Sequence, residues 1–212
     1  MNDAATITAA LAALESPAAE RNSAAIAAVL ARWLPASGRL LELACGALQH
    51  ARRIAPDHPQ LHWQPSDLRP ELLTLAPRLR DALHTDWPEN LAPPIRLDVL
   101  EVPWPLTDFD VLYTANLLHI APPAVSEQLF AQAPKVLRPG GELLVYGPFR
   151  EGGRFRSVGD ARFDESLRAR DPAWGIRDLE WLEALARAAG LELVEREAMP
   201  ANNLFLRCRA RA

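Results

Sequence analysis

A glycine and an aspartate in this chain have the types and the spacing that hold a nucleotide ribose. Gly46 follows a short apolar run, Leu40 to Ala44, which predicts a buried strand, and it precedes a segment that predicts a helix. A glycine turn between a strand and a helix brings backbone N–H groups close to a ligand. Asp67 lies about 20 residues further along, at the end of a second strand-like run, where doubly wound folds hold a ribose. The pair predicts an adenosine-containing cofactor.

The residues around Gly46 narrow the kind of cofactor. A dinucleotide fingerprint, G-x-G-x-x-G, would need glycine where the chain has Leu48 and Ala51, so that fingerprint fails. Glu42, Ala44 and Gly46 instead resemble motif I of the class I S-adenosylmethionine (SAM) methyltransferases, in which an acid is followed by spaced glycines. The alternative is an ordinary turn between a strand and a helix.

Three further runs predict strands, and polar side chains lie near the end of each. Ligands of open α/β sheets bind beyond the carboxyl ends of the strands, so these side chains are candidate ligands. The runs are Ile95 to Val99 with Asp98, Phe109 to Ala115 with Asn116 and His119, and Glu142 to Phe149 with Tyr146. Their order, with a Pro-Gly-Gly turn before the last, is that of a SAM methyltransferase domain.

Six blocks of the chain are more specific than these strand ends. They are Ser16 to Asn22, Trp63 to Asp67, Ala115 to Ile120, Tyr146 to Phe149, Phe163 to Gly175 and Met199 to Asn203. Together they resemble the DUF938 family, a group of SAM-dependent methyltransferases that includes the methyltransferase-like 26 proteins. The resemblance covers nearly the whole chain from Ser16 onward. It implies a Rossmann-like methyltransferase fold, SAM as cofactor and S-adenosylhomocysteine as product.

One residue departs from the family pattern. Leu48 stands where the family has a second glycine in this turn. If the position needs a positive φ or a close backbone approach, leucine is costly there. If the position instead lies just inside the helix, leucine is tolerated.

The order of elements predicts an α/β fold. Strand-like runs alternate with helical segments, which favours a parallel sheet. The last two runs, Leu191 to Ala198 and Leu204 to Arg209, leave no room for a helix between them, so they must be antiparallel. We therefore expect a Rossmann-like class I methyltransferase fold, with a seven-stranded mostly parallel sheet, a C-terminal antiparallel hairpin and helices on both faces.

The 212 residues contain no linker-like or low-complexity stretch, so we expect a single domain over residues 1–212. Residues 1–37 predict an N-terminal helical segment. Residues 150–176 form a long connection that we interpret as a substrate lid loop. The alternative is a partly helical surface excursion, because Ala161 to Arg168 could form a helix.

Nine residues are candidate cofactor ligands. Gly46 would pass closest to the methionine part, and Asp67 would accept hydrogen bonds from both ribose hydroxyls. Asp98 would accept from the adenine amino group, and Arg21 and Asn22 would reach the cofactor carboxylate. The alternatives are a helix cap for Asp67, a turn for Asp98 and a solvated helix start for Arg21 and Asn22. The full set is Arg21, Asn22, Glu42, Ala44, Gly46, Asp67, Asp98, Val99 and Asn116.

Methyl transfer from an activated sulfonium mainly requires positioning of the reactants and, where needed, removal of a proton. His119 is the candidate base because its ordinary pKa is near neutrality; the alternative is a structural histidine. Tyr146 is the second catalytic candidate and, with Asn116, would orient the acceptor. The candidate substrate-binding residues, which could equally serve loop packing and turns, are Asp171, Trp174, Asn202 and Asn203.

Composition excludes several classes of function. A net charge of −4 argues against a general nucleic-acid binder, which usually carries a basic face. The two cysteines give neither a disulfide framework nor a metal-site spacing, and Cys45 is interpreted as a small buried residue rather than a reactive thiol. The N-terminus lacks a signal sequence and no apolar run reaches membrane length, so we expect a cytoplasmic protein without membrane contact.

The sequence therefore predicts a SAM-dependent methyltransferase that acts on a small molecule, with no resident metal. The alternatives are a degenerate member that binds or regulates without methyl transfer, and a protein methyltransferase. The acceptor atom and the oligomeric state are left open.

Overall fold

The protein is described from a computed structural model that covers residues 4–83 and 87–211. Its elements group into two compact units, Met1–Asp98 and Val99–Ala212. The predicted single domain stays a prediction. Helices and strands alternate along both units, which confirms the α/β fold class.

Three parallel strands form the sheet of the first unit, in the order β3-β2-β1. They are β1 (Gly38–Leu43), β2 (Leu61–Asp67) and β3 (Ile95–Arg96). Strand β1 pairs with β2 from Gly38↔Leu61 to Leu43↔Ser66, and Asp67 pairs with Arg96 of β3. The near-continuous apolar run of β1 is buried, as expected of a parallel strand covered on both faces.

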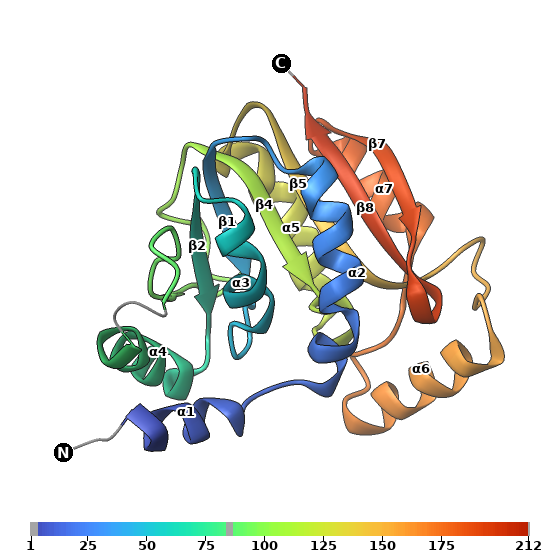
Figure 1. The fold of residues 1–212 in the computed structure, drawn as a ribbon. Coiled ribbons are helices and arrows are strands. Elements are labelled where there is room, and N and C mark those ends of the chain that lie inside the picture. The colour runs from blue at the N-terminus through green and yellow to red at the C-terminus, as the bar shows by residue number, and fades with distance from the viewer. Residues whose placement is uncertain (1–3, 84–86, 212) are drawn as a thin grey trace. The chain divides into compact units, whose positions relative to one another are not determined.

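The helices of the first unit are α1 (Ala4–Ala12), α2 (Pro17–Trp33), α3 (Gln49–Ile54) and α4 (Pro70–Leu83), with a 3₁₀ turn over Ala55–Asp57. Helix α2 begins at Pro17, because the Ser16 hydroxyl caps the amides of Ala18 and Ala19 and proline suits the first turn. Its apolar stripe, Ile26, Val29, Leu30 and Trp33, is buried. Helix α2 packs against α3, and α1 lies beside α4 (Figure 1).

The second unit holds the remaining strands, in the order β4-β5-β8-β7. They are β4 (Phe109–Ala115), β5 (Leu137–Arg150), β7 (Leu191–Ala198) and β8 (Asn203–Ala210), with the short β6 (Arg177–Asp178) parallel to the end of β5. Strands β4 and β5 are parallel, whereas β8 is antiparallel to both β5 and β7. The predicted C-terminal antiparallel hairpin is therefore confirmed.

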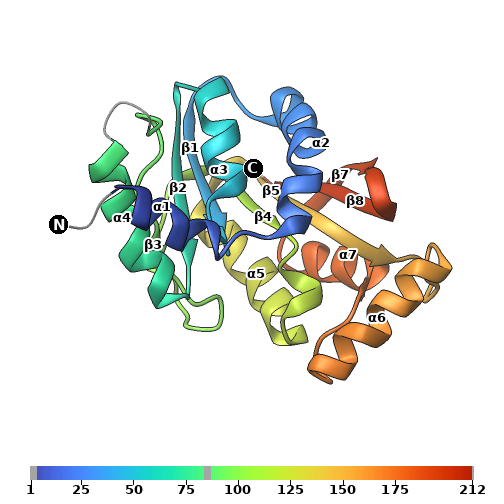
Figure 2. The same cartoon turned by 60° about the horizontal axis from the view of Figure 1, so that its bottom comes forward.

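The helices of the second unit are α5 (Pro123–Val136), α6 (Val158–Arg170) and α7 (Leu179–Ala188), with 3₁₀ turns over Leu118–Ile120 and Pro200–Asn202. Helices α5 and α7 pack on each other and lie on one side of β4 and β5 (Figure 2). The segment interpreted as a lid loop, residues 150–176, contains helix α6, which is capped by Ser157. Its backbone therefore matches the alternative, a partly helical surface excursion. Its role as a lid stays a prediction.

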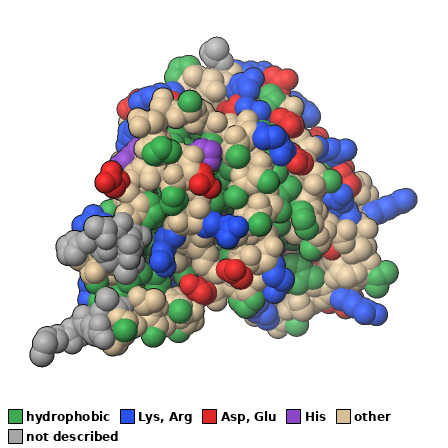
Figure 3. Space-filling view, in the orientation of Figure 1, with side chains coloured by type: hydrophobic (Ala, Val, Ile, Leu, Met, Phe, Trp, Pro, Cys, Tyr) green, Lys and Arg blue, Asp and Glu red, His purple; other side chains and the backbone are tan. Residues whose placement is uncertain are grey.

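Charged side chains of both signs lie among hydrophobic ones over the face shown in Figure 3. Within residues 4–83 and 87–211, no helix has the length and apolar character needed to cross a membrane.

Candidate functional site

The turn after β1 has an unusual backbone. Ala44, Gly46 and Leu48 all have φ between 53° and 64°, in the left-handed region. The Cys45 amide donates to the Ser66 carbonyl over 3.0 Å, and the Leu48 amide donates to the Cys45 carbonyl over 3.1 Å. These hydrogen bonds fix the turn against β2. A tight turn that presents backbone N–H groups thus follows β1, as the motif predicts.

The structure decides between the two alternatives for Leu48. It is the N-cap of α3 and has φ 64° and ψ 21°, so the position does require a positive φ. A left-handed conformation costs a non-glycine residue roughly 1–2 kcal/mol. The Leu48 side chain is completely buried, and such burial contributes about 1.5–3 kcal/mol, which offsets the strain. Burial of the side chain is therefore what allows leucine to occupy this left-handed position.

Asp67 is buried at the end of β2, and several N–H groups converge on its carboxylate. Oδ2 accepts from the Gly46 amide over 3.0 Å, which ties the two residues that the sequence paired. Oδ1 accepts from the amides of Leu68 and Arg69 over 2.8 and 3.0 Å. Asp67 thus caps the turn before α4, as its structural alternative predicts, and also supports the Gly46 turn.

The guanidinium of Arg69 also lies on this carboxylate. Its Nε donates to Oδ1 of Asp67 over 3.2 Å and its Nη2 to Oδ2 over 3.4 Å. A β-carbon added at Gly46 would lie 3.6 Å from the same Nη2, so the guanidinium also covers the glycine turn. Arg69 was not among the predicted site residues, because neither the glycine turn nor the spacing to Asp67 involves it.

Asp98 follows β3 on the same side of the sheet. Because β1, β2 and β3 are parallel and in register, their carboxyl ends lead into the Gly46 turn, Asp67 and Asp98 at one edge. The Leu97 amide donates to the Asp67 carbonyl over 3.3 Å, which holds the chain after β3 beside β2. Gly46, Asp67 and Asp98 therefore follow the ends of neighbouring strands of the first unit, and their contact with a cofactor stays a prediction. Val99, the first residue of the second unit, is buried.

Glu42 is buried in β1, behind the turn. Its Oε2 accepts from the indole Nε1–H of Trp63 over 2.8 Å. Burial, reinforced by the nearby Asp67 charge, raises the pKa of Glu42 to about 8 against the opposing effect of the Trp63 hydrogen bond. The side chain is accordingly mainly protonated at neutral pH. Burial likewise raises the pKa of the Cys45 thiol well above its ordinary value, so Cys45 is the inert buried residue that was expected.

The start of α2 is hydrogen-bonded to the first residues of α3. The Gln49 side chain accepts from the Ser16 amide over 2.7 Å and donates to the Ser16 carbonyl over 3.2 Å. The side chain of Asn22 is hydrogen-bonded to Nε2 of His50 over 2.8 Å. Burial lowers the pKa of His50 to about 4, so its ring is neutral at physiological pH. Asn22 is thus occupied by His50, while Arg21 is exposed to solvent, and their proposed contact with a cofactor carboxylate stays a prediction.

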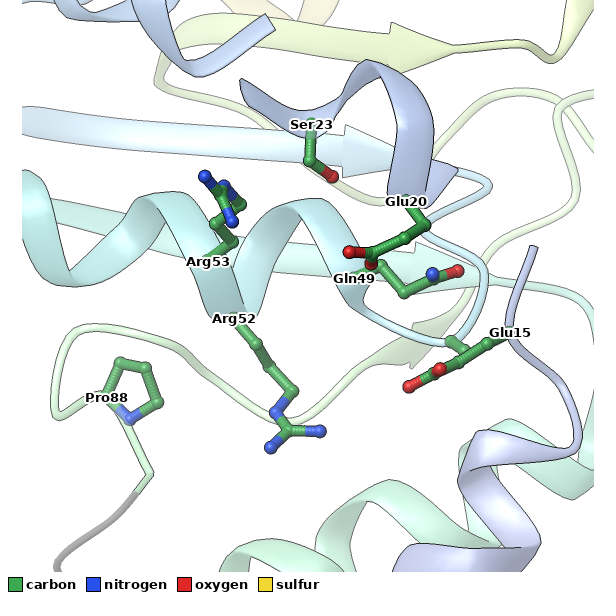
Figure 4. A pocket seen from close by; sticks show the side chains of 8 residues that line it. Glu15, Glu20, Ser23, Gln49, Arg52, Arg53 and Pro88 are labelled. Carbon is green, nitrogen blue, oxygen red and sulfur yellow. The ribbon is translucent and has the colours of Figure 1, made fainter. Parts of the chain in front are cut away.

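An open polar cleft of about 250 Å³ lies between the start of α2 and helix α3 (Figure 4). The acidic side chains of Glu15 and Glu20 and the guanidinium of Arg52 face it. None of the predicted site residues lines this cleft. Its lining residues are Glu15, Glu20, Ser23, Ala47, Gln49, Arg52, Arg53 and Pro88.

In the second unit, Asn116 and His119 follow β4. Asn116 has φ 59°, and its amide donates to the Tyr146 carbonyl over 2.9 Å, so the ends of β4 and β5 are joined there. His119 is buried and makes an edge contact with Phe163, with ring centroids 5.5 Å apart. Burial and, secondarily, the like charge of Arg177 lower the pKa of His119 to about 4. A neutral imidazole is the form that can accept a proton.

Tyr146 lies in the core of the second unit. Its ring is 2% exposed and meets Phe205 edge-on, with centroids 5.7 Å apart. Asn116 and Tyr146 are therefore brought together through their backbones, and the Tyr146 ring contributes to the core. Its predicted role in orienting an acceptor stays a prediction.

Arg177 is a residue that the sequence reasoning missed. Its buried guanidinium donates to the carbonyls of Leu118 over 3.1 Å, of Ala173 over 3.0 Å and, by a further hydrogen bond, of Ala121. These contacts tie the turn that carries His119 to the segment after α6. An arginine is suited to this because its planar fork carries five donors. No sequence signal separates it from the other arginines of this region.

The candidate substrate-binding residues mainly stabilise turns and join neighbouring segments of the chain. Asp171 accepts from the Ala173 amide over 2.8 Å, and the Arg170 guanidinium lies 4.9 Å from the centre of the Trp174 ring. The Asn202 side chain donates to the Ser157 hydroxyl over 2.9 Å, and that of Asn203 donates to the Pro200 carbonyl over 3.0 Å. These contacts match the structural alternative, and the acceptor roles stay predictions.

The residues of the first unit fit an adenosine cofactor. The backbone at Gly46 is left-handed, and among the described residues a β-carbon placed there would meet only the movable end of Arg69 within 4 Å. Both carboxylate oxygens of Asp67 accept from the guanidinium of Arg69. A group that accepts a two-pronged N–H donor can also accept the two hydroxyls of a ribose. In the part of the chain that the structure describes, no group of three or more His, Cys, Asp or Glu side chains could hold a metal ion.

Solved structures of methyltransferases share this fold. An O-methyltransferase family protein from Burkholderia thailandensis superposes with a TM-score of 0.75 at 19% identity, over 92% of this chain and 58% of that one. Human N-acetylserotonin methyltransferase, solved with SAM, gives a TM-score of 0.72 at 18% identity, over 90% and 52%. CalO1, a methyltransferase of calicheamicin biosynthesis solved with S-adenosylhomocysteine, gives 0.69 at 22%, over 91% and 55%.

This chain thus spans little more than half the length of those proteins, and the likeness shows the Rossmann-like methyltransferase fold. The family model described as "Protein of unknown function (DUF938)" matches residues 14–210, almost the whole chain. The chain therefore belongs to the DUF938 family.

Proposed function

We propose that this protein is a SAM-dependent methyltransferase that acts on a small molecule. The observation that carries the proposal is the Gly46–Asp67 hydrogen bond at the end of β1 and β2, where a left-handed glycine turn and a buried carboxylate meet. The fold shared with methyltransferases supports the same reaction class, and so does family membership.

The cofactor would supply an activated methyl group on a positively charged sulfur. Asp67 would accept hydrogen bonds from the ribose hydroxyls, and the turn at Gly46 would approach the methionine part. Asp98 and Val99 are the proposed contacts of the adenine. Protonated Glu42 would stay neutral behind the turn and leave Asp67 as the buried anion at this edge.

His119 is the proposed proton acceptor. The lowered pKa keeps the imidazole neutral over the physiological range, the form that would accept a proton from a hydroxyl, amine or thiol as the methyl group is transferred, and it also makes the ring a weaker base than a free histidine. Arg177 would hold the turn that carries it. Asn116 and Tyr146 remain the proposed residues that orient the acceptor.

A second candidate is a member that binds SAM weakly and serves as a binding protein. Leu48 no longer favours it, because its backbone keeps the left-handed turn. The bidentate contact of Arg69 with Asp67 does favour it, since the guanidinium lies on the proposed ribose acceptor.

The two candidates are separated by turnover. The purified protein is incubated with methyl-labelled SAM and a panel of small phenols, carboxylates, amines and thiols, and release of S-adenosylhomocysteine is followed. The methyltransferase proposal predicts acceptor-dependent release. Binding of both adenosyl ligands without release on any acceptor class would favour the binding protein.

A further inference from the structure

Arg69 and the ribose of an adenosyl cofactor would need the same positions on Asp67. A carboxylate offers about four lone-pair positions. The amides of Gly46, Leu68 and Arg69 take three hydrogen bonds, and the Arg69 guanidinium adds two more, one on each oxygen. The acceptor is therefore fully occupied by groups of this chain.

The three backbone donors are fixed by the turn and by the start of α4, so they cannot leave without unfolding the turn. The guanidinium is different, because it stands at the end of a flexible side chain that is 39% exposed. Its two N–H groups are the only donors on the carboxylate that can swing away into solvent, among those that the structure describes. They also approach Gly46, the other residue assigned to the cofactor.

We propose that Arg69 is an affinity-setting residue of the cofactor site: its guanidinium competes with the ribose hydroxyls for Asp67 and leaves when the cofactor binds. This rests on the proposed SAM site. The chemistry is an exchange of one pair of donors for another, since two N–H groups and two O–H groups would occupy the same carboxylate edge. The effect is modest, because the guanidinium end of this ion pair is exposed to water, which weakens the attraction.

The first test compares the affinity of S-adenosylhomocysteine for the wild-type protein and for Arg69→Ala, by calorimetry at low salt. Loss of the competitor should tighten binding about two- to five-fold, the equivalent of a surface ion pair. Arg80→Ala is the matched control, because Arg80 pairs with its neighbour Asp81 within helix α4 and is about as exposed as Arg69. The control should bind like the wild type.

Two further measurements tie the effect to the ribose. With the 2′,3′-dideoxy analogue of S-adenosylhomocysteine, the difference between Arg69→Ala and the wild type should disappear, because no diol competes for Asp67. Raising the salt from about 0.01 to 0.5 M should tighten binding to the wild type but not to Arg69→Ala, because salt screens a half-exposed ion pair. Arg69→Met, which keeps an unbranched stem without the charge or its N–H donors, should behave like Arg69→Ala and controls for a packing effect.

The outcomes separate this inference from the proposed function. Tighter binding by Arg69→Ala, or binding by that variant alone, supports the competition. Equal or weaker binding by Arg69→Ala overturns it and leaves the SAM site standing. If neither the wild type nor any variant binds the ligand at millimolar concentration, the cofactor proposal fails and the competition fails with it.

Discussion

His50 Nε2 lies 2.8 Å from the side-chain oxygen of Asn22 and joins the start of helix α2 to helix α3. Asn22 ends one of the blocks that resemble the family and His50 follows the Gly46 turn, yet their contact is with each other. The buried ring holds α2 against the helix that follows the Gly46 turn. Asn22, proposed as a ligand of the cofactor carboxylate, is thus held by a contact within the chain.

Buried neutral histidines predict a loss of stability in mild acid. The pKa of His50 and that of His119 fall from 6.5 to about 4 in the folded protein. A depressed pKa means that the unfolded chain binds the proton first, so the free energy of unfolding should fall as the pH drops from 6.5 towards 4. Each ring accounts for up to about 3 kcal/mol. Denaturant unfolding of His50→Gln against pH checks this: the variant should lose less stability over that window, and an unchanged pH slope would contradict it.

Glu42 predicts the opposite dependence at higher pH. The pKa of Glu42 is raised from 4.5 to about 8 in the folded state. Its contribution to the free energy of unfolding is therefore complete below pH 4.5 and is lost as the pH rises through 8. Glu42→Gln resembles the protonated side chain and should remove this loss. Unfolding curves between pH 5 and 9 measure it. A variant and wild type with parallel pH profiles would show that Glu42 is ionised in the folded protein.

Leu48 combines backbone strain with burial, and two variants separate these effects. Leu48→Ala keeps the strain and loses the packing, so it should be destabilised by about 2–5 kcal/mol. Leu48→Gly loses the same packing but relieves the strain, and should be more stable than Leu48→Ala by about 1 kcal/mol. Equal stability of the two variants would mean that the position is not left-handed in solution. Binding of S-adenosylhomocysteine should change less than two-fold between them.

Gly175 lies where the chain after α6 passes Asp164 and Arg168. A β-carbon there would lie 2.5 Å from the Arg168 guanidinium and 2.8 Å from Oδ1 of Asp164, at φ +145°. Gly175→Ala should therefore cost more than 2 kcal/mol of unfolding free energy. Gly153→Ala is the control, since its φ is +71° and a β-carbon there would have no atom of the described residues within 4 Å beyond its chain neighbours. Strain alone should cost about 1 kcal/mol. Similar losses in both variants would argue against a close approach at Gly175.

Features of this site that follow from local sequence patterns could be predicted, whereas contacts made by long side chains could not. The Gly46 turn, the acid at the end of β2 and the antiparallel β7–β8 pair follow from local patterns, and all three are confirmed. The conformation of Leu48 was left open, because a leucine at that position suits a helix start as well as a strained turn. Arg69 and Arg177 were missed, since a guanidinium reaches its partners through a long side chain that leaves no periodic signal.

The most direct test of the SAM site is a titration of the wild type and Asp67→Ala with SAM and S-adenosylhomocysteine, with Asp81→Ala as the control on the exposed face of α4. The account predicts binding by the wild type and by the control. It predicts a loss of about 1–3 kcal/mol in Asp67→Ala, or about 5- to 150-fold. Asp67→Asn, together with thermal unfolding of each variant, separates loss of the acceptor from collapse of the Gly46 turn. Affinity that is unchanged in folded Asp67→Ala, or a wild type that binds neither ligand at millimolar concentration, would contradict the account.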